Sequence, residues 1–318
     1  MAFRSGFVAI IGRPNAGKST LLNALAGEKL AIVSPKPQTT RTRILGVLHV
    51  QNKKGKPGAQ VVLIDTPGVH RPDSSLGRKM LHDVHEALNG SDLVLVIVDA
   101  RGKQQAEDEF LMALVKGAKT PAFLLLNKID LLREGKRQLL PLMERYSRLH
   151  EFQEIIPISA RRREGLDLLL GKLLAALPEK PPYFPPDQVT DQPARFMAAE
   201  LVREQVLLAT SEEVPHSTTV VVDQFEEGGK LTRIAATIYC EREGQKRILV
   251  GRQGQMLKKI GTAARVEIEK MLGTRVFLEL FVKVHPRWRE SRGFVEELDW
   301  RRQLEHLISA ETGPASQS

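Results

Sequence analysis

The chain has 318 residues, of which 42% are hydrophobic, so it is no disordered polymer and has room for two domains of ordinary size. No stretch approaches 18 uncharged apolar residues, which excludes an ordinary transmembrane helix, and the single Cys240 excludes an internal disulfide. The formal charge of +9 favours a polyanionic partner. The lone cysteine and the lack of a signal-peptide pattern predict a cytoplasmic protein.

Residues 1–177 alternate short apolar runs with amphipathic stretches. Near-continuous apolar runs are typical of strands that helices bury on both faces, so this region predicts a doubly wound, mostly parallel α/β sheet. Turn-forming residues at 52–58 predict a hairpin between residues 44–50 and 59–64. The other predicted strands lie at residues 7–11, 93–98, 123–126 and 155–158.

A proline-rich stretch at 178–192 predicts an extended linker, because proline fixes its own backbone and donates no hydrogen bond. Beyond it, residues 193–285 change pattern to a helix, a β-rich pair, a short apolar segment, a helix and a last strand. This order predicts a smaller α+β domain. We expect a C-terminal helix and a disordered tail within 286–318.

The first motif with chemistry follows the first predicted strand and opens a helix, which is the expected context of a phosphate-binding loop. Glycines let the backbone wrap a phosphate, successive N–H groups face the anion, the lysine reaches the β- and γ-phosphates, and the serine hydroxyl binds Mg²⁺. The residues are Gly12, Arg13, Pro14, Asn15, Ala16, Gly17, Lys18 and Ser19, and Thr20 continues the predicted nucleotide contact.

Two further motifs close strands of the predicted sheet, at the edge where such sheets bind ligands. Asp65 would hold Mg²⁺ and the Gly68 N–H would contact the γ-phosphate, with Thr66 and Pro67 completing that turn. The carboxylate of Asp130 can accept hydrogen bonds from guanine N1–H and from the 2-amino group that adenine lacks, so this motif selects GTP over ATP. It is completed by Asn127, which braces loops, Lys128, which lies along the base, and Ser159 and Ala160, which face guanine O6.

Together these motifs resemble the translation-factor-like GTPases, and the resemblance covers nearly the whole first domain. It implies a switch threonine that binds Mg²⁺, for which Thr40 is favoured over Thr39. Val69 occupies the position where Ras-like enzymes carry a catalytic glutamine, so hydrolysis of GTP to GDP and phosphate is expected to be slow. Asn15 resembles an asparagine that ligates K⁺ in related GTPases, so the predicted catalytic residues are Lys18, Thr40 and, through K⁺, Asn15.

The second domain contains a G-x-x-G segment between the short apolar segment and a basic helix. Such a loop clamps a nucleic-acid backbone, because its glycines permit close approach. With its flanking elements, the segment resembles a bacterial, type II KH domain, which binds single-stranded RNA. The predicted RNA-binding residues are Gly251, Arg252, Gln253, Gly254, Lys258 and Lys259.

A GTPase domain, a proline-rich linker and a C-terminal KH domain resemble the Era GTPase family over residues 5–300. The resemblance implies a monomer that binds 16S rRNA near its 3′ end and acts in maturation of the small (30S) ribosomal subunit. It also implies loose contact with the inner face of the membrane. Two alternatives stay open: a membrane-associated signalling or cell-cycle GTPase, in which basic residues at 53–56 and 161–163 meet lipid, and a passive RNA-binding protein with structural GTP.

The charge is divided unevenly between the two domains. Residues 1–178 carry 27 basic and 17 acidic groups, whereas residues 179–318 carry 20 and 21. Residues 246–275, however, include 8 basic residues and only 2 acidic ones. This local excess around the G-x-x-G segment is typical of a surface that contacts phosphates.

Overall fold

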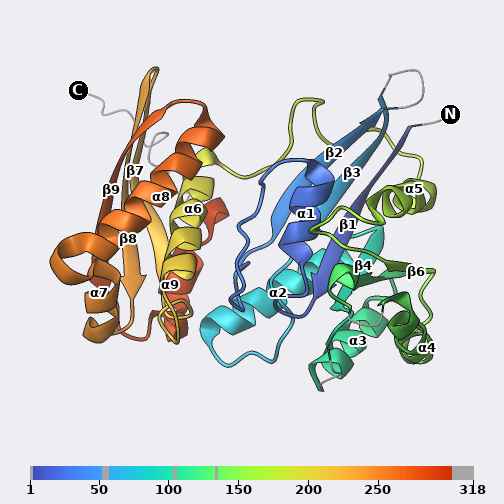
Figure 1. Ribbon diagram of the computed structural model, residues 1–318. Coiled ribbons are helices and arrows are strands. Elements are labelled where there is room, and N and C mark those ends of the chain that lie inside the picture. The colour runs from blue at the N-terminus through green and yellow to red at the C-terminus, as the bar shows by residue number, and fades with distance from the viewer. Residues whose placement is uncertain (1–2, 52–56, 103–105, 133–134, 303–318) are drawn as a thin grey trace, which may run out of the picture. The chain divides into compact units, whose positions relative to one another are not determined.

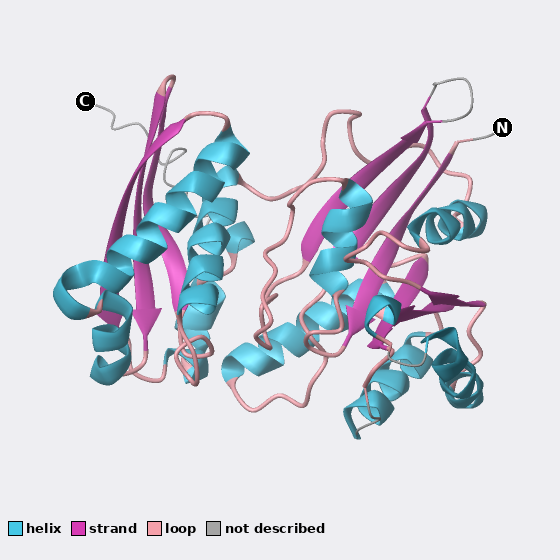
Figure 2. Ribbon diagram, in the orientation of Figure 1, coloured by secondary structure: helices cyan, strands magenta, loops and turns pink. Residues whose placement is uncertain are grey.

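The structure, a computed structural model, describes residues 3–51, 57–102, 106–132 and 135–302. The chain divides into two compact units, the first formed by residues 1–71 and 80–192 and the second by residues 72–79 and 193–318. Each unit has its own sheet (Figure 1, Figure 2). Residues 72–79, which sequence analysis placed in the first domain, thus group with the second unit. The predicted basic loop at 53–56 and the predicted tail beyond residue 302 lie outside the described residues.

Six strands form the sheet of the first unit, in the order β2-β3-β1-β4-β5-β6. All neighbours are parallel except β2 and β3, which form the predicted antiparallel hairpin. The strands are β1 (Arg4–Gly12), β2 (Ile44–Gln51), β3 (Pro57–Asp65), β4 (Leu93–Asp99), β5 (Ala122–Asn127) and β6 (Glu154–Pro157). The helices among them are α1 (Lys18–Ala26), α2 (Ser75–Asn89), α3 (Ala106–Ala118), α4 (Leu139–Leu149) and α5 (Leu166–Ala176).

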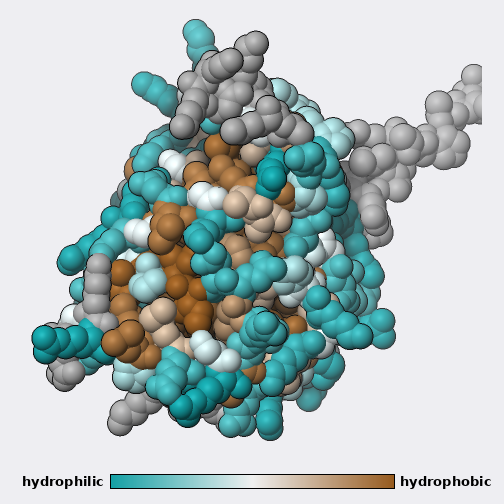
Figure 3. Space-filling view, turned by 90° about the vertical axis from the view of Figure 1, so that its right-hand side faces the viewer, coloured by the Kyte–Doolittle hydropathy of each residue, from teal (hydrophilic) through white to brown (hydrophobic). Residues whose placement is uncertain are grey.

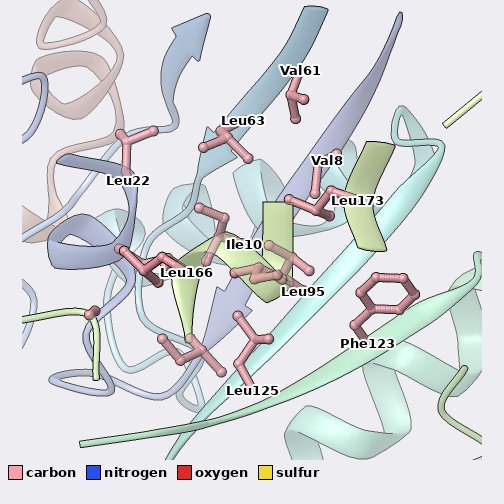
Figure 4. Packing of buried hydrophobic residues seen from close by; sticks show 14 of the residues in the cluster. Val8, Ile10, Leu22, Val61, Leu63, Leu95, Phe123, Leu125, Leu166 and Leu173 are labelled. Carbon is pink, nitrogen blue, oxygen red and sulfur yellow. The ribbon is translucent and has the colours of Figure 1, made fainter. Parts of the chain in front are cut away.

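Apolar side chains bury both faces of this sheet, as a doubly wound fold requires. On β1, Val8 and Ile10 join a core that includes residues of α1 and α5 (Figure 4), whereas Ala9 and Ile11 join a second core with residues of α2, α3 and α4. The side of the unit that carries α4, α5 and β6 shows apolar atoms between polar ones (Figure 3). Because parallel strands place their carboxyl ends at one edge, the predicted motifs converge there.

The proline-rich segment is held against the first unit rather than spanning free space. Ser5 donates from its hydroxyl to the Pro181 carbonyl at 2.6 Å, and the Phe7 and Tyr183 rings lie 4.7 Å apart. Farther along, the Val47 N–H donates to the Val189 carbonyl at 2.8 Å. The last contact covers part of the edge of β2, which would otherwise present unpaired backbone groups.

The second unit has the α-β-β-α-α-β order that the resemblance to a type II KH domain implies. Its strands β7 (Thr219–Gly228) and β8 (Leu231–Cys240) are antiparallel, and β9 (Arg275–Val284) pairs parallel to β8. The short apolar segment before the G-x-x-G loop, whose pattern fits either a strand or a short helix, is a helix. The helices are α6 (Ala194–Ala209), α7 (Glu243–Val250), α8 (Gln255–Leu272) and α9 (Arg292–Glu297). No helix within the described ranges is long and apolar enough to cross a membrane.

Candidate functional site

The phosphate-binding loop wraps tightly because two glycines leave room for neighbouring groups. A Cβ at Gly12 would lie 2.3 Å from the Ile97 carbonyl oxygen, and a Cβ at Gly17 would lie 2.2 Å from Nδ2 of Asn127. Gly17 also has φ 106°, and Asn15 has φ 61°, both in the left-handed region. Glycine adopts this region at little cost and asparagine more readily than most residues, so the sequence fits the loop that the backbone forms.

Lys18 is buried beneath this loop, with its Nζ donating to the carbonyl oxygens of Gly12 at 3.2 Å and Arg13 at 3.0 Å. Burial lowers the pKa of Lys18 to about 8, although the nearby Asp65 carboxylate opposes this shift. The ammonium therefore sits in a poorly solvated place where an added phosphate charge would be strongly attracted.

The three predicted Mg²⁺ ligands meet at one corner of the site. Ser19 donates from Oγ to Oδ2 of Asp65 at 2.6 Å, the Ser19 and Thr40 hydroxyl oxygens lie 2.8 Å apart, and Thr40 donates to the same carboxylate oxygen at 3.3 Å. Burial raises the pKa of Asp65 to about 6, against the opposing effects of Lys18 and these hydrogen bonds.

This corner fits Mg²⁺ by its chemistry. The second carboxylate oxygen of Asp65, Oδ1, is buried and lacks a hydrogen-bond partner within the described structure. Mg²⁺ prefers a carboxylate, hydroxyls and phosphate oxygens to a cage of protein carboxylates. Accordingly, no group of three acidic, histidine or cysteine side chains suited to a metal occurs in the described part of the chain. Ser19, Thr40 and Asp65 would hold the ion, which supplies charge neutralisation at the phosphates.

The two adjacent threonines point to different partners. Thr39 donates to the Lys36 carbonyl at 2.7 Å and lies 2.7 Å from the Ser34 hydroxyl. Thr40, by contrast, contacts both Ser19 and Asp65. The structure therefore brings Thr40 to the metal corner, whereas Thr39 folds the preceding loop onto itself.

We expect Thr40→Ala to weaken Mg²⁺-dependent GTP binding and to slow hydrolysis by at least about 10-fold, because it removes one hydroxyl from the metal corner. Thr39→Ala, the matched control, should stay within about 3-fold of the unaltered protein. Titration of GTP at several Mg²⁺ concentrations, together with phosphate release, measures both effects. Equal losses in the two variants would show that Thr40 has no special role.

The turn after β3 is fixed against the phosphate-binding loop. Thr66 is buried and donates to the Ile10 carbonyl at 2.9 Å, and the Val69 N–H donates to the Gly12 carbonyl at 3.0 Å. Gly68 approaches so closely that a Cβ there would lie 2.7 Å from Cγ of Pro14. Thr66 thus anchors the turn, and Val69 is buried in a core with no group able to orient water.

The base-binding motif forms a connected frame. Asn127 donates to the Ala16 carbonyl at 2.8 Å and accepts from the Ala160 N–H at 3.0 Å, so it braces both loops. Asp130 accepts from the Ser159 hydroxyl at 2.6 Å. Its carboxylate is thereby oriented on the same side as the Ser159–Ala160 backbone, which is the arrangement that guanine recognition needs.

Sequence reasoning missed two residues of this frame, Asp99 and Arg101. Asp99 ends β4 and accepts from Lys128 at 2.8 Å and from Arg101 at 2.9 Å. Burial alone would raise the pKa of Asp99, but these hydrogen bonds outweigh it and lower that pKa to about 2. Asp99 therefore stays charged and holds the Lys128 ammonium. The signal was an aspartate at the end of a buried apolar strand.

A cavity of about 590 Å³ joins the phosphate and base ends of the site. Of the predicted residues, those that line it are Pro14, Asn15, Gly17, Lys18, Ser19, Thr20, Thr40, Gly68, Asn127, Lys128, Asp130, Ser159 and Ala160. Arg13 does not, because its guanidinium lies 3.5 Å from Asp108. The other predicted residues outside the lining are Gly12, Ala16, Asp65, Thr66 and Pro67. Lining residues outside the predicted nucleotide contacts include Val33, Pro35, Gln38 and Arg161.

The G-x-x-G loop connects α7 to α8 in the second unit. Gly251, Gln253 and Gly254 all have positive φ (71°, 51° and 77°), and Arg252 is exposed. A shallow groove of about 400 Å³ begins at this loop. Gly254 and Lys258 line it, whereas Lys259 is exposed but lies outside the lining; the other lining residues are Leu257, Gly261, Thr262, Arg265, Leu278 and Leu280.

Comparison with known proteins agrees with the assignment of both domains. Residues 7–128 match the family described as 50S ribosome-binding GTPase, and residues 213–289 match the KH domain family. The "GTPase Era" of Syntrophus aciditrophicus (strain SB) is 50% identical over 300 residues, which cover 94% of this chain and 95% of that protein.

Two solved structures extend the likeness to the fold. The structure of a single-substitution variant of Aquifex aeolicus Era bound to GDP·AlF4⁻ has a TM-score of 0.88 at 40% identity and covers 93% of this chain and 99% of that one. An Era structure with MgGDPNP and nucleotides 1506–1542 of 16S ribosomal RNA has a TM-score of 0.89 at 40% identity, covering 94% and 99%. The predicted fold class, GTP hydrolysis and KH domain are confirmed. This chain belongs to the Era family of GTPases.

Proposed function

We propose that this GTPase binds 16S rRNA near its 3′ end through the KH domain and acts in maturation of the small ribosomal subunit. The main evidence for this proposal is the groove between α8 and β9. Its lining combines glycine backbone and the basic side chains of Lys258 and Arg265 with the apolar side chains of Leu278 and Leu280. Cationic and apolar groups side by side are what single-stranded RNA needs for its phosphates and its bases. A relative in complex with nucleotides 1506–1542 of 16S rRNA supports the identity of the RNA.

The nucleotide acts as a timer in this proposal. Bound GTP and Mg²⁺ hold the loop that contains Thr40 close to Asp65, and hydrolysis removes the γ-phosphate that stabilises this arrangement. The protein is a cytoplasmic monomer that binds the subunit in one nucleotide state and leaves it in the other. The exposed arginines at 161–163 add positive charge that could contact phosphates from the GTPase domain. Two of them already have partners, since Arg162 lies 3.7 Å from Asp130 and Arg163 donates to the Ala24 carbonyl.

Retention on purified 30S particles, measured with GDP and with a non-hydrolysable GTP analogue, tests this function. We expect retention only with the analogue, and enrichment of the 3′ end of 16S rRNA after crosslinking in cells. Binding that ignores the nucleotide would favour the passive RNA-binding protein. Binding to anionic vesicles without binding to particles would favour the membrane-associated GTPase.

Gly254→Asp and Gly254→Asn form a matched pair for the groove. Gly254 has φ 77°, and a Cβ there meets nothing within 4 Å, so both side chains fit in space. Both residues also tolerate the left-handed region better than most, and they differ in charge alone. Because a carboxylate repels the RNA phosphates, only Gly254→Asp should lose retention to a large degree.

The proposal includes stimulation by K⁺ through Asn15. The Asn15 amide donates to the Pro35 carbonyl at 2.8 Å, beside the loop that carries Thr40. A side-chain amide has both a donor NH₂ group and an acceptor oxygen. If the Asn15 amide rotates by half a turn, its own oxygen lies beside the Pro35 carbonyl oxygen. Two such oxygens suit a monovalent cation, which would neutralise charge that develops on the γ-phosphate.

We expect GTP hydrolysis to be about 10-fold or more faster in K⁺ than in Na⁺, and Asn15→Ala to remove this difference. The measurement is phosphate release at equal ionic strength. Asn89→Ala, at the end of α2, serves as a control that should keep the full K⁺ response. Equal rates in the two salts, unchanged by Asn15→Ala, would disprove this part of the proposal.

A further inference from the structure

The open face of the KH sheet carries two exposed phenylalanines that the G-x-x-G groove does not use. Phe277 is 46% exposed and Phe281 is 51% exposed, both on β9. Among the described residues, the remaining exposed aromatic side chain is Tyr183. Only 5% of the residues in this chain are aromatic, so two exposed phenylalanines on one strand are unusual and need a physical explanation.

The strand alternation places these rings opposite the groove. Along β9, Val276 is buried and Leu278 and Leu280 line the groove beside α8, whereas Phe277 and Phe281 point to the other face. The burial pattern of β8 shows the same two faces, since Ile234, Ala236 and Ile238 are buried on the side of the core. The helices α6 and α8 lie on one side of this sheet (Figure 2). Burial of large rings on the helix side would stabilise the domain, but their exposure on the open side does not.

Arg233 completes a platform with the two rings. It lies opposite Phe277 in the β8–β9 pairing, and its guanidinium carbon is 5.6 Å from the centre of that ring. Within the described structure Arg233 has no ion pair, so the N–H groups of its stacked guanidinium stay available. Arg275 and Lys283, exposed on the same face of β9, add positive charge at its ends. The negative groups near the rings are Glu279 between them, Glu226 opposite Arg233 on β7, and Asp223, which accepts from Thr237 opposite Phe281. We call Arg233, Phe277 and Phe281 the outer platform.

We propose that the outer platform is a second RNA-binding surface, on which unpaired bases stack beyond the four nucleotides that the groove holds. Stacked aromatic rings and a guanidinium plane bind bases without regard to sequence. β9 is the edge strand of the sheet and contributes to both surfaces, so an RNA that leaves the groove passes around one strand to reach the platform. The inference rests on the proposed RNA binding. A KH groove takes about four nucleotides, so an RNA as long as the proposed 3′-terminal segment must place the rest elsewhere.

Paired substitutions separate stacking from simple apolar contact. The double variant Phe277→Leu/Phe281→Leu keeps apolar side chains but loses the flat rings, whereas Phe277→Tyr/Phe281→Tyr keeps the rings. The probe is an RNA with the sequence of nucleotides 1506–1542 of 16S rRNA, and its affinity is measured by fluorescence anisotropy at fixed salt. We expect the leucine variant to bind at least about 10-fold more weakly and the tyrosine variant to stay within about 3-fold of the unaltered protein.

Truncation of the same RNA locates the effect. As the RNA is shortened to the smallest fragment that still binds, the leucine variant and the unaltered protein should converge to one affinity, since a short fragment occupies only the groove. Leu208→Ala, at another exposed apolar side chain (54%, on α6), should bind all fragments normally. Thermal unfolding of each variant confirms that the fold is intact.

Three outcomes have distinct meanings. If the leucine variant binds the long RNA as tightly as the unaltered protein while Gly254→Asp fails to bind, the platform proposal is wrong and the groove stands. If the leucine variant binds free RNA normally but loses retention on 30S particles, a protein occupies this face and the RNA proposal is also wrong. If the unaltered protein binds neither RNA nor particles, the proposed function itself fails.

Discussion

Asp130→Asn should transfer the nucleotide preference of this GTPase from guanine to xanthine. The Asp130 carboxylate accepts from the Ser159 hydroxyl at 2.6 Å and lines the cavity, where its remaining acceptor capacity would meet a guanine base. Asparagine keeps an oxygen for Ser159 but presents an NH₂ group in place of the second oxygen. That group opposes the 2-amino group of guanine and pairs with the 2-oxo group of xanthine. We expect GTP to bind at least about 100-fold more weakly, because buried polar groups would be left unpaired.

Competition between GTP and XTP for a fluorescent nucleotide measures this exchange. Asp167→Asn, in the exposed first turn of α5, removes the same charge away from the base and should leave the preference for GTP unchanged. If Asp130→Asn weakened GTP and XTP equally, the substitution would have damaged the loop, and the role of Asp130 in base selection would be unsupported.

Lys18→Ala should reduce the rate of GTP hydrolysis by about 100-fold or more. The buried Nζ of Lys18 donates to the Gly12 and Arg13 carbonyls, so it is held where the β- and γ-phosphates arrive. Its removal takes away a positive charge in a poorly solvated site, where charges interact strongly. Single-turnover phosphate release measures the loss. Lys116→Ala, at an exposed lysine in the last turn of α3, should keep full activity, and comparable activity in both variants would contradict the assignment.

The same lysine predicts a pH dependence of GTP binding. Because burial lowers the pKa of Lys18 to about 8 in the nucleotide-free protein, the amine loses its proton as the pH rises above that value. Bound phosphates favour the charged form and raise this pKa again, so GTP binding above pH 8 must take up a proton. The affinity should therefore fall as the pH rises from 8 toward 10. Asp65, with a pKa of about 6, is already ionised in this range and contributes no proton.

Titration calorimetry at pH 9 in buffers of different ionisation enthalpy detects the proton directly. We expect the apparent binding enthalpy to depend on the buffer for the unaltered protein and to be nearly independent of it for Lys18→Ala. The same enthalpy in all buffers with the unaltered protein would show that Lys18 keeps its charge without nucleotide.

The site could be predicted in large part because its chemistry depends on short segments. A Gly-x-x-x-x-Gly-Lys-Ser run folds around a phosphate through its own backbone, and an aspartate after an apolar strand reaches the ligand edge of a parallel sheet. The same holds for the G-x-x-G loop, whose glycines adopt the positive φ that the turn needs. The resemblance to a KH domain likewise implied the α-β-β-α-α-β topology, although the local pattern left the short segment before the G-x-x-G loop open between strand and helix.

The remaining features depend on contacts between segments far apart in the chain. Resemblance to related GTPases favoured Thr40 over Thr39, and the physical reason is the position of Asp65 on β3, which Thr40 contacts. Arg13 lies in the phosphate-binding motif, yet Asp108 of α3 draws its side chain away from the cavity. Likewise, Asp99 joins the base frame only because β4 and β5 end side by side.

The sequence motifs, with the families that they resemble, thus identified a GTPase joined to a KH domain, because each motif binds through backbone and side chains that lie within a few residues of one another. Tertiary structure alone decided which polar groups meet across strands, how residues 178–190 lie against β1 and β2, and that Phe277 and Phe281 point away from the core. The reason is physical: a side chain's direction depends on which face of the sheet the helices cover, and packing between distant segments sets that face.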